Sequence, residues 1–357
     1  MIVSNLVLRN FRNYDWLDVK FEKGINFIVG DNAAGKTNIV EAIHFLSLAR
    51  SFRTSKNTDL IKERRQFATI EARVEEDTTH KSIVAILTPS HKKISCNGKP
   101  IKRISDLSDL INVIVFEPKD SLMFNDSPMV RRNFLDINLS KKSKGYLESL
   151  MIFEKLLNER NAILKKEELD LVQLEVVTDQ LIDVQESIVK YRQLFVGEIN
   201  KLLSKVIESI KGDNESAYLE YEPYVKFEKN YKQIATRAYE KNLESDIKHK
   251  MTQVGIHRED FKMILNGNDV STYGSQGENR IAVIALKLTP YFLIEDKDKK
   301  PIIVLDDVMS ELDQEHKKRL IKFLRKFEQV FITSTSSNVS NTSIYEVNKH
   351  IVTRRNA

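Results

Sequence analysis

The stretch Val29–Thr37, "VGDNAAGKT", decides the fold class of this 357-residue chain. Its glycines and its Lys-Thr pair have the spacing of a phosphate-binding loop, whose backbone N–H groups surround a phosphate. The apolar run Ile25–Val29 precedes it, as a short buried strand does, and apolar residues at helical spacing follow it. A strand, a tight loop and a helix start leave several N–H groups unpaired in one concavity, where the helix dipole adds positive charge. The stretch therefore predicts an α/β fold that binds a nucleoside triphosphate.

The residues of this loop have individual expected roles. Lys36 is expected to reach the terminal phosphates, and the Thr37 hydroxyl is expected to ligate Mg2+. The alternative interpretation is a glycine-containing turn that enters a helix and binds nothing. The other predicted nucleotide-binding residues of the loop are Gly30, Asp31, Asn32, Ala33, Ala34, Gly35 and Asn38.

A second motif, "PIIVLDDVMSELD" at Pro301–Asp313, is an apolar strand that ends in two aspartates. A nucleotide-binding sheet needs a carboxylate there to share the magnesium ion with Thr37, and Asp306 is predicted in that role. Asp307 is then placed to orient or deprotonate the attacking water. Lys36, Asp306 and Asp307 are the predicted catalytic residues. Apolar strands that end in acids are common, so the prediction depends on the pairing with the phosphate loop.

The distance between the two motifs predicts the organisation of the chain. Thr37 and Asp306 are 269 positions apart, from 306 − 37. Because both must meet around one metal ion, the two ends of the chain are expected to form one ATPase from which the middle projects. The predicted parts are residues 1–120 and 251–357 for the ATPase and residues 121–250 for a helical insert.

The middle of the chain has the pattern of long helices. No proline occurs after Pro128 until beyond residue 211, and apolar residues from Leu174 to Ile210 recur at steps of three and four. A segment at Leu147–Leu164 is the expected antiparallel partner. An ordinary helical bundle and a short coiled-coil arm are both consistent with this pattern. Strands are expected at Asn5–Arg9, Trp16–Phe21, Ala68–Val74, Ser82–Leu87, Asn112–Phe116, Tyr218–Val225, Phe261–Leu265 and Val270–Tyr273, with a helix at Tyr231–Lys250.

Composition limits the class of protein. The chain is 41% apolar and 30% charged, and it contains no run of about 18 apolar residues, so no membrane span is expected. Its start alternates as a strand does and lacks the pattern of a signal peptide. The single cysteine, Cys96, excludes an internal disulfide and suits a reducing cytoplasm. The net charge of +5 permits a polyanionic partner without requiring one.

A third motif, "YGSQGENR" at Tyr273–Arg280, precedes a helix with an apolar stripe. Ser275 and Glu278 have the spacing of a capping box, so a simple helix start is one interpretation. The neighbouring glycines favour another, because glycine lets the backbone approach a ligand closely. A helix start with free N–H groups can bind a γ-phosphate. Since the phosphate loop already serves the chain's own nucleotide, Ser275, Gln276 and Gly277 are predicted to contact a nucleotide held by another subunit.

The order of phosphate loop, helical insert, Ser-x-Gly signature and acidic strand resembles the ABC-type heads of SMC-like ATPases. Shorter strings resemble more specifically the RecF family of bacterial DNA recombination and repair ATPases, and they follow the family's order over nearly the whole chain. These strings are "LRNFRNY" (Leu8–Tyr14), "GDNAAGKTNIVEAI" (Gly30–Ile43), "SFR" (Ser51–Arg53), "SPMVRRNFLD" (Ser127–Asp136), "YGSQGENR" and "LDDVMSELD" (Leu305–Asp313).

The resemblance implies ATP and Mg2+ as ligands, an ATP-dependent homodimer with two nucleotides between its subunits, and slow, DNA-stimulated hydrolysis. It also implies binding of gapped or single-strand/double-strand junction DNA, and cooperation with RecR and RecO in loading recombinase onto single strands. A cytoplasmic, nucleoid-associated protein is expected. Arg12 matches an arginine that approaches the bound nucleotide in related heads.

The sequence departs from the family's pattern at three places. Its signature has Glu278 and Asn279 where Gln-Gln is more frequent, and Ile256 stands where proline is usual. His257, beside it, has no predicted role other than loop packing. The strand Gln329–Ser336 lacks the histidine that transporter ATPases place after it, so fast turnover is not expected.

Basic clusters are the candidates for DNA binding, because the sequence contains no helix-turn-helix or zinc pattern. We predict contacts to phosphates rather than to bases, and hence binding that salt weakens steeply. Charge runs are often only solvated faces, which is the alternative for each cluster. The predicted DNA-binding residues are Arg50, Arg53, Arg64, Arg65, Arg131 and Arg132, with lysines beside them at Lys62, Lys141, Lys142 and Lys144.

Two other functions are open on the sequence. The ATPase subunit of a membrane transporter shares the signature, but such subunits usually lack a heptad-striped insert of this length and retain a Gln loop and a switch histidine. A non-hydrolysing scaffold is the third possibility, although the Asp306-Asp307 pair is unexpected in one.

Overall fold

The computed structural model describes residues 1–77, 79–212, 214–337 and 339–355, which fold into two compact units. Unit 1 comprises Met1–Ser121, Val206–Asp213 and Val283–Ala357, and unit 2 comprises Leu122–Lys205 and Asn214–Ala282. The second unit therefore extends past residue 250, where the sequence analysis ends the insert, because strands on both sides of that residue pair with each other. Within the described residues, no helix is both long and apolar enough to cross a membrane.

The sheet that carries the phosphate loop lies in unit 1 and is mostly parallel. Its strand order is β15-β14-β3-β13-β12-β8, and all its neighbours are parallel except β14 and β15. The carboxyl ends of its parallel strands meet at one edge, where the phosphate loop follows β3 and the Asp306–Asp307 pair follows β12. The strands are β3 (Gly24–Val29), β8 (Val113–Phe116), β12 (Ile302–Leu305), β13 (Gln329–Ser334), β14 (Ser343–Asn348) and β15 (Ile351–Arg355).

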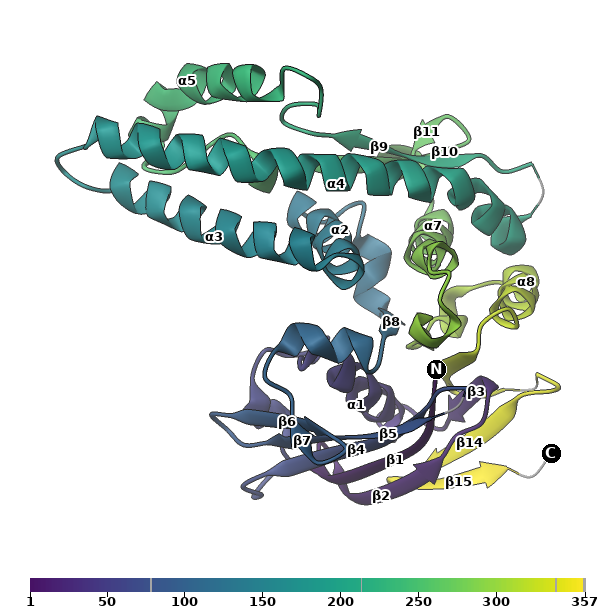
Figure 1. Cartoon of the computed structure of the whole chain (residues 1–357). Helices are drawn as coiled ribbons and strands as arrows, with labels where there is room; N and C mark the ends of the chain where they lie inside the picture. Colours follow the sequence, from purple (N-terminus) through teal and green to yellow (C-terminus); the bar gives the residue numbers. More distant parts are fainter. Residues whose placement is uncertain (78, 213, 338, 356–357) are drawn as a thin grey trace. The chain divides into compact units, whose positions relative to one another are not determined.

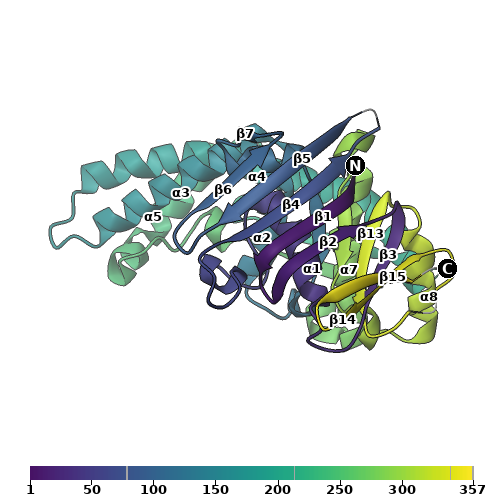
Figure 2. The same ribbon diagram turned by 90° about the horizontal axis from the view of Figure 1, so that it is seen from below.

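A second six-stranded sheet in unit 1 is antiparallel, with the order β2-β1-β4-β5-β6-β7. Figure 2 shows this sheet in front of helix α1. Alternate residues of β4 are fully buried because one face of the sheet packs on the core and the other faces solvent. The strands are β1 (Ile2–Phe11), β2 (Tyr14–Lys20), β4 (Ala68–Glu75), β5 (His80–Leu87), β6 (Lys92–Cys96) and β7 (Lys99–Pro100).

One hydrophobic core joins both sheets of unit 1 to α1 (Lys36–Leu48) (Figure 1). It contains Leu6 and Ile83 from the antiparallel sheet, Ile43 from α1 and Phe331 from the parallel sheet. Because α1 is covered on several sides, every residue from Ile39 to Ser47 is buried, including the polar residues Glu41, His44 and Ser47. Unit 1 also contains α8 (Gln314–Leu324) and short 3-10 turns at Asn57–Leu60, Ile104–Asp109, Pro118–Leu122, Thr289–Leu293, Lys297–Lys299 and Met309–Glu311.

Unit 2 is a helical lobe with a small sheet of order β11-β10-β9. Its long helices α3 and α4 are antiparallel, since Ser149 lies opposite Ser187 and Arg160 opposite Thr178. This confirms the predicted helical insert. The elements are α2 (Pro128–Lys142), α3 (Lys144–Leu164), α4 (Leu171–Lys211), β9 (Ala217–Glu222), α5 (Tyr231–His249), a 3-10 turn at Ile256–Arg258, β10 (Asp260–Leu265), β11 (Asn268–Asp269), α6 (Val270–Tyr273) and α7 (Gln276–Leu288), with the ends of α4 and α7 belonging to unit 1.

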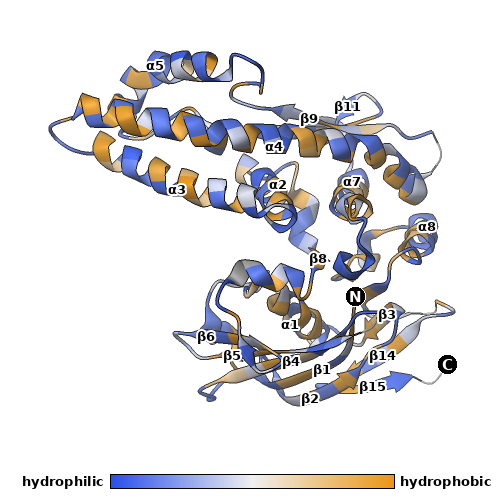
Figure 3. Cartoon of the chain, in the orientation of Figure 1, coloured by the Kyte–Doolittle hydropathy of each residue, from blue (hydrophilic) through white to orange (hydrophobic). Residues whose placement is uncertain are grey.

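The buried stripe of α4 is wider than predicted. Leu174, Leu181 and Ile188 are buried as expected, but so are Ile182 and Val189, which lie beside the predicted seam. The apolar residues along α4 are visible in Figure 3. A two-stranded coiled coil buries only one narrow seam, so α4 packs as a helix of a bundle with partners on more than one side.

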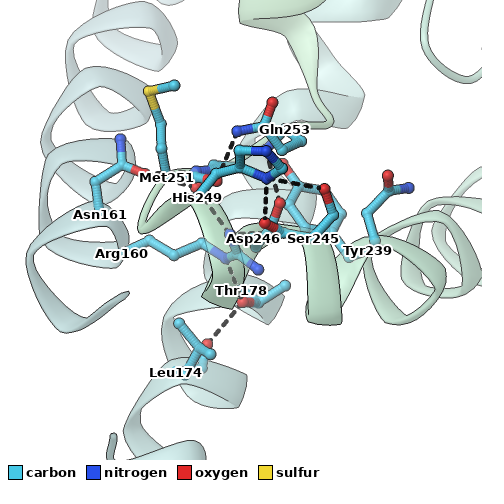
Figure 4. A network of polar contacts seen from close by, with 12 residues as sticks. Arg160, Asn161, Leu174, Thr178, Tyr239, Ser245, Asp246, His249, Met251 and Gln253 are labelled. Carbon is cyan, nitrogen blue, oxygen red and sulfur yellow. Dashed lines mark hydrogen bonds and ion pairs between the residues drawn. The ribbon is translucent and has the colours of Figure 1, made fainter. Parts of the chain in front are cut away.

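A buried polar network fastens the helices of unit 2 to one another (Figure 4). The Arg160 guanidinium donates to the Asp246 carboxylate at 2.7 Å, to the Thr252 hydroxyl at 2.8 Å and to the Thr178 hydroxyl at 2.8 Å. Arg160 is 1% exposed and Asp246 is fully buried. The guanidinium also lies 5.0 Å from the ring centre of Tyr239. These contacts join α3, α4 and the end of α5.

One predicted strand is wrong. Val270–Tyr273 forms the short helix α6, because the Asp269 side chain accepts the backbone N–H of Ser271 and so caps a helix start. Only Asn268 and Asp269 pair with β10 after the turn. The predicted strand at Tyr218–Val225 is present but ends at Glu222.

Candidate functional site

The phosphate loop joins β3 to α1 in unit 1 and has the backbone that an anion cradle needs. Ala33 and Gly35 have positive φ values of 64° and 110°. A Cβ on Gly30 would lie 2.3 Å from the Val347 carbonyl oxygen, so only glycine fits there. No side chain caps the N–H groups where α1 begins at Lys36. These N–H groups and the positive end of the helix dipole are therefore available to an anion.

Lys36 folds over this loop. Its Nζ donates to the carbonyl oxygens of Gly30 at 2.8 Å and of Asp31 at 2.7 Å. Partial burial lowers the pKa of Lys36, and the nearby carboxylates of Asp307 and Asp306 oppose that shift. The ammonium is thus held at the loop in a place where carboxylates favour its charged form.

The two sequence motifs meet in the structure. The Thr37 hydroxyl donates to Asp306 Oδ1 at 2.9 Å, although the residues are 269 positions apart. Thr333, at the end of β13, donates from its hydroxyl to the same oxygen at 2.6 Å. Asp306 is only 5% exposed, and this burial raises the pKa of its carboxyl group. A carboxylate held by two hydroxyls in a buried place is a strong candidate metal ligand.

Asp307 has a different environment from its neighbour. Its φ of 51° turns the chain sharply after β12, and its N–H donates to the Thr333 hydroxyl at 2.9 Å. The side chain is exposed, whereas that of Asp306 is buried. Two adjacent carboxylates with different surroundings can take different roles, one holding a metal ion and the other acting on water.

Arg12 is occupied by a buried carboxylate. Its guanidinium forms a two-pronged pair with Glu41 of α1, through Nε at 2.9 Å and Nη2 at 2.5 Å, and its Nη1 donates to the Asp59 carbonyl at 2.8 Å. Glu41 has a fully buried side chain and also accepts from Arg53 at 3.4 Å and from Ser51. The cluster fixes the β1–β2 turn beside the phosphate loop. Whether Arg12 approaches a nucleotide stays a prediction.

The signature motif lies in unit 2 and forms the capping box at the start of α7. Ser275 accepts the N–H of Glu278 at 3.3 Å, and Glu278 accepts the N–H of Ser275 at 3.1 Å. Both side chains, together with Gln276 and Gly277, are exposed or nearly so. A Cβ on Gly274 would lie 2.6 Å from the Val270 carbonyl oxygen, so this glycine is required for the turn. The motif therefore presents a solvent-facing helix start.

The six predicted DNA-binding arginines are not equivalent. Arg50 and Arg64 are exposed, and Arg64 forms an ion pair with its exposed neighbour Glu63 at 3.7 Å. Arg65 pairs with Asp15 at 3.2 Å while remaining half-exposed, and Arg53 is shared between Asn38 and Glu41. Arg132 is half-buried and donates to the Glu259 carbonyl at 2.7 Å. Arg64 and Arg50 are thus the freest candidates.

Arg131 is the least accessible of the six predicted DNA-binding arginines. Its side chain is 9% exposed and pairs with Asp260 through two nitrogens at 2.7 and 2.8 Å. Its remaining terminal nitrogen donates to the carbonyl oxygens of Met123, Phe124 and Asp126. Most of its N–H groups are engaged inside unit 2, so Arg131 stabilises this unit, and its burial argues against the predicted DNA contact.

His257 is a packing residue. Its Nε2 lies 3.1 Å from the Thr252 carbonyl oxygen, and its ring packs 6.1 Å from that of Phe153. Burial lowers the pKa of His257 to about 4, so the ring is neutral at physiological pH. Arg258 beside it also contacts the Thr252 carbonyl, at 3.4 Å.

The candidate metal ligands fit magnesium better than zinc. Within the described residues, no group of three or more His, Cys, Asp or Glu side chains converges as a protein-only metal site does. Mg2+ keeps several waters and is commonly bound through one or two protein oxygens together with phosphates. Thr37 and Asp306, hydrogen-bonded at 2.9 Å, supply such oxygens beside the phosphate loop.

The sequence analysis missed several residues of the site. Thr333 is separated from Asp306 by 27 positions and reaches it because β13 lies beside β12. Glu41 is a carboxylate between the apolar pairs Ile39-Val40 and Ala42-Ile43 of α1, and a charge among apolar residues was a usable signal. Asn13 and His350 touch the loop from distant turns, and nothing local to them indicates this.

Comparison with known proteins is consistent with this geometry. The family model of the RecF/RecN/SMC N-terminal domain matches residues 2–357. A protein of Halalkalibacterium halodurans named "DNA replication and repair protein RecF" is 36% identical, over 97% of this chain and 98% of the relative. A protein of the same name from Clostridium novyi is 37% identical, over 94% of this chain and 93% of the relative.

Solved structures give the same result. A structure described as the recombination mediator protein RecF with ATP in the RecFOR pathway superposes with a TM-score of 0.89 at 34% identity, covering 99% of this chain and 97% of that one. An Smc head domain of Pyrococcus furiosus superposes with a TM-score of 0.59 at 17% identity, covering 99% and 95% of the two chains. The latter shows likeness of fold alone.

Proposed function

Because the chain belongs to the RecF family of DNA replication and repair proteins, we propose that it is an ATP-dependent, dimeric DNA-binding clamp of recombinational repair. It binds ATP with Mg2+ and hydrolyses ATP slowly, and DNA stimulates the hydrolysis. A transporter ATPase is not favoured, since relatives named for DNA replication and repair match nearly the whole chain.

The observation that carries the proposal is the 2.9 Å hydrogen bond between the Thr37 hydroxyl and Asp306. It unites the phosphate loop with the acidic strand at the edge where parallel strands end, which is where such sheets bind nucleotides. The bare N–H groups of α1 and the ammonium of Lys36 supply positive charge at the same place. A turn with a purely structural role would have no need to combine this hydrogen bond with unpaired N–H groups and a lysine ammonium.

Each residue then has a role in hydrolysis. The loop N–H groups and Lys36 bind the β- and γ-phosphates, and Thr37 and Asp306 hold the magnesium ion, which neutralises developing charge when bound. Asp307, whose carboxylate is exposed beside them, orients the attacking water. We assign the nucleotide site to unit 1 and the helical insert to unit 2, whose boundary with the following ATPase segment lies after Ala282 rather than after residue 250.

We assign the signature, Ser275 to Gly277, to the nucleotide of a second subunit. Its helix start is exposed, and the side chains of Ser275 and Glu278 cap it reciprocally, an interaction that a phosphate can replace. A two-fold dimer then encloses two nucleotides, each bound by the loop of one subunit and the signature of the other.

DNA and protein partners follow from the family. Exposed arginines such as Arg50 and Arg64 supply a non-specific attraction to phosphates, at gaps or at single-strand/double-strand junctions. RecR- and RecO-type mediators are the proposed protein partners in loading recombinase, and the cytoplasm, on the nucleoid, is the proposed location. The solved relative in the RecFOR pathway supports this assignment.

Two variants test the shared active site. Lys36→Met removes a charged donor, so we expect ATP affinity to fall at least about tenfold. Ser275→Arg should bind ATP normally but lose dimerisation and hydrolysis, because the arginine obstructs the partner's nucleotide. Titration with labelled ATP, gel filtration and phosphate release measure the three properties.

Mixing the two inactive proteins gives the sharper result. Half of randomly formed dimers are mixed, and each mixed dimer has one intact site, so about one quarter of the wild-type activity should return. Lys201→Ala, at an exposed position of α4 distant from both motifs in sequence, is the control and should retain full activity. If the mixture stays inactive while each protein is folded, the shared site is wrong even though ATP binding stands.

A further inference from the structure

The turn between β14 and β15 reaches the phosphate loop from the far end of the chain. β14 runs parallel to β3 with Glu346 opposite Val29, so the turn emerges where the loop begins. His350 in that turn places Nδ1 3.0 Å from the Ala34 carbonyl oxygen and 2.8 Å from Asn13 Nδ2. Its ring also lies edge-on to Tyr14, with centres 5.8 Å apart.

A chain of hydrogen bonds fixes which way these groups point. Arg53 Nη1 donates to Asn38 Oδ1 at 2.9 Å, Asn38 Nδ2 donates to Asn13 Oδ1 at 2.7 Å, and Asn13 Nδ2 then faces His350. Arginine can only donate, so it sets the orientation of both amides. Asn13 therefore donates to His350 Nδ1, which must carry a lone pair in this state.

While His350 Nδ1 accepts from Asn13, it cannot donate to the Ala34 carbonyl oxygen. A carbonyl oxygen 3.0 Å away needs a proton on Nδ1, and the asparagine needs a lone pair there. His350 thus has two mutually exclusive partners, one in the relay from Arg53 and one in the phosphate loop.

The Ala34 carbonyl matters because it belongs to the same peptide unit as the Gly35 N–H. In a trans peptide the two groups point in opposite directions, so holding the carbonyl away from the cradle aims the N–H into it. Gly35 has no intrahelical partner for this N–H, because it is the residue before α1. An anion that accepts from the N–H polarises the peptide and makes the carbonyl a stronger acceptor.

We propose that His350 is a positioning residue of the phosphate loop, which exchanges Asn13 for the Ala34 carbonyl when nucleotide binds. The donated Nδ1–H aligns the Ala34–Gly35 peptide so that its N–H meets the phosphate. In nucleotide-free protein the proton is on Nε2, and in the bound form Nδ1 carries a proton. This inference rests on the proposed nucleotide site and adds His350 to it, 314 positions after Lys36, from 350 − 36.

Two substitutions of His350 distinguish the role of its hydrogen-bond donor from the role of its ring. His350→Ala removes the donor, and His350→Asn retains a donor of similar reach and tolerates the positive φ of 68° at this position. Loss of one hydrogen bond should weaken labelled ATP with Mg2+ about fivefold in the alanine variant, and the asparagine variant should remain within about twofold of wild type. Lys349→Gln, exposed in the same turn, is the matched control and should bind as wild type.

A spectroscopic measurement reports the proton directly. Long-range 1H–15N spectra distinguish the ring nitrogens of the seven histidines, and the His350→Ala protein assigns the relevant signals. We expect Nδ1 of His350 to change from unprotonated to protonated when ATP is added, which a merely structural residue would not do.

The outcomes separate this inference from the proposed function. If wild-type protein binds no ATP and Lys36→Met is indistinguishable from it, the proposed function fails. If wild type binds ATP but His350→Ala binds equally well, or His350→Asn is as weak as alanine, the role of His350 is refuted alone. An unchanged Nδ1 signal on ATP addition would refute the exchange. Thermal unfolding of the nucleotide-free variants, expected within about 2 °C of wild type, verifies that they are folded.

Discussion

Asp306 combines burial with a negative charge, and the two oppose each other. Burial raises the pKa of its carboxyl group, so the folded state binds a proton more tightly than the unfolded state does. The stabilisation from that proton is present at low pH and is lost as pH rises through the raised pKa. At neutral pH the protein therefore holds a charge at the expense of stability, which is expected where a metal ion must be bound.

We predict that Asp306→Asn makes the nucleotide-free protein more stable and inactive. The amide oxygen can still accept from Thr37 and Thr333, while the buried charge is gone. A gain of about 1 kcal/mol should raise the melting temperature by about 2 °C at neutral pH, and Mg2+-dependent hydrolysis should disappear. Scanning calorimetry should show the gain shrinking as the pH is lowered. A variant that is less stable than wild type at every pH would show that burying the Asp306 charge does not destabilise the folded protein.

Among the helices of unit 2, Arg160 and Asp246 form a buried ion pair that we expect to contribute strongly to stability. Their pair at 2.7 Å is buried on both sides and links α3 to the end of α5. Removing one partner from such a pair leaves the other charge buried and alone. By contrast, Lys232 and Asp183 form an ion pair between α5 and α4 that is more than half exposed on each side.

We predict that Asp246→Ala lowers the free energy of unfolding of unit 2 by about 3–5 kcal/mol. Asp183→Ala, which breaks the exposed pair between α4 and α5, should lower the free energy of unfolding by less than about 1 kcal/mol. Urea unfolding followed by circular dichroism measures both. Similar costs for the two variants would mean that the buried pair contributes no more than a surface one.

The elements of the site were predictable where a local pattern determines them. The phosphate loop, the Asp306 strand and the helical insert all follow from spacing and periodicity, because glycine geometry and apolar repeats act over short stretches. Val270–Tyr273 was mistaken for a strand because the apolar signal outweighed the cap at Asp269. Thr333 and His350 were not predictable, since only the pairing of distant strands brings them to the loop.

At the scale of the whole molecule, charge is spread rather than concentrated. The net charge of +5 comes from 56 basic and 51 acidic residues, so the proposed DNA binding depends on where a few exposed arginines lie. Buried pairs such as Arg131–Asp260 contribute to that count without contributing to the field at the surface.

We predict that affinity for duplex DNA falls steeply with salt and that single arginines change the steepness. Neutralising about four phosphates gives a slope near −3.6 in a plot of log affinity against log salt concentration. Arg64→Ala should reduce the magnitude of the slope by about 0.9 without altering stability. Arg131→Ala should instead destabilise the fold and leave the slope of the folded protein unchanged. Fluorescence anisotropy at several salt concentrations distinguishes the two, and equal slopes for wild type and Arg64→Ala would remove Arg64 from the interface.

The central place of β3 also has a consequence for how the chain is made. Both of its neighbours, β13 and β14, begin about 300 residues later, at Gln329 and Ser343. While the ribosome translates the intervening segment, the nascent β3 exposes two unpaired edges, which are prone to pair with other chains. Chaperone protection during synthesis is therefore expected to matter most for β3 and the phosphate loop after it, which are made long before the strands that cover them.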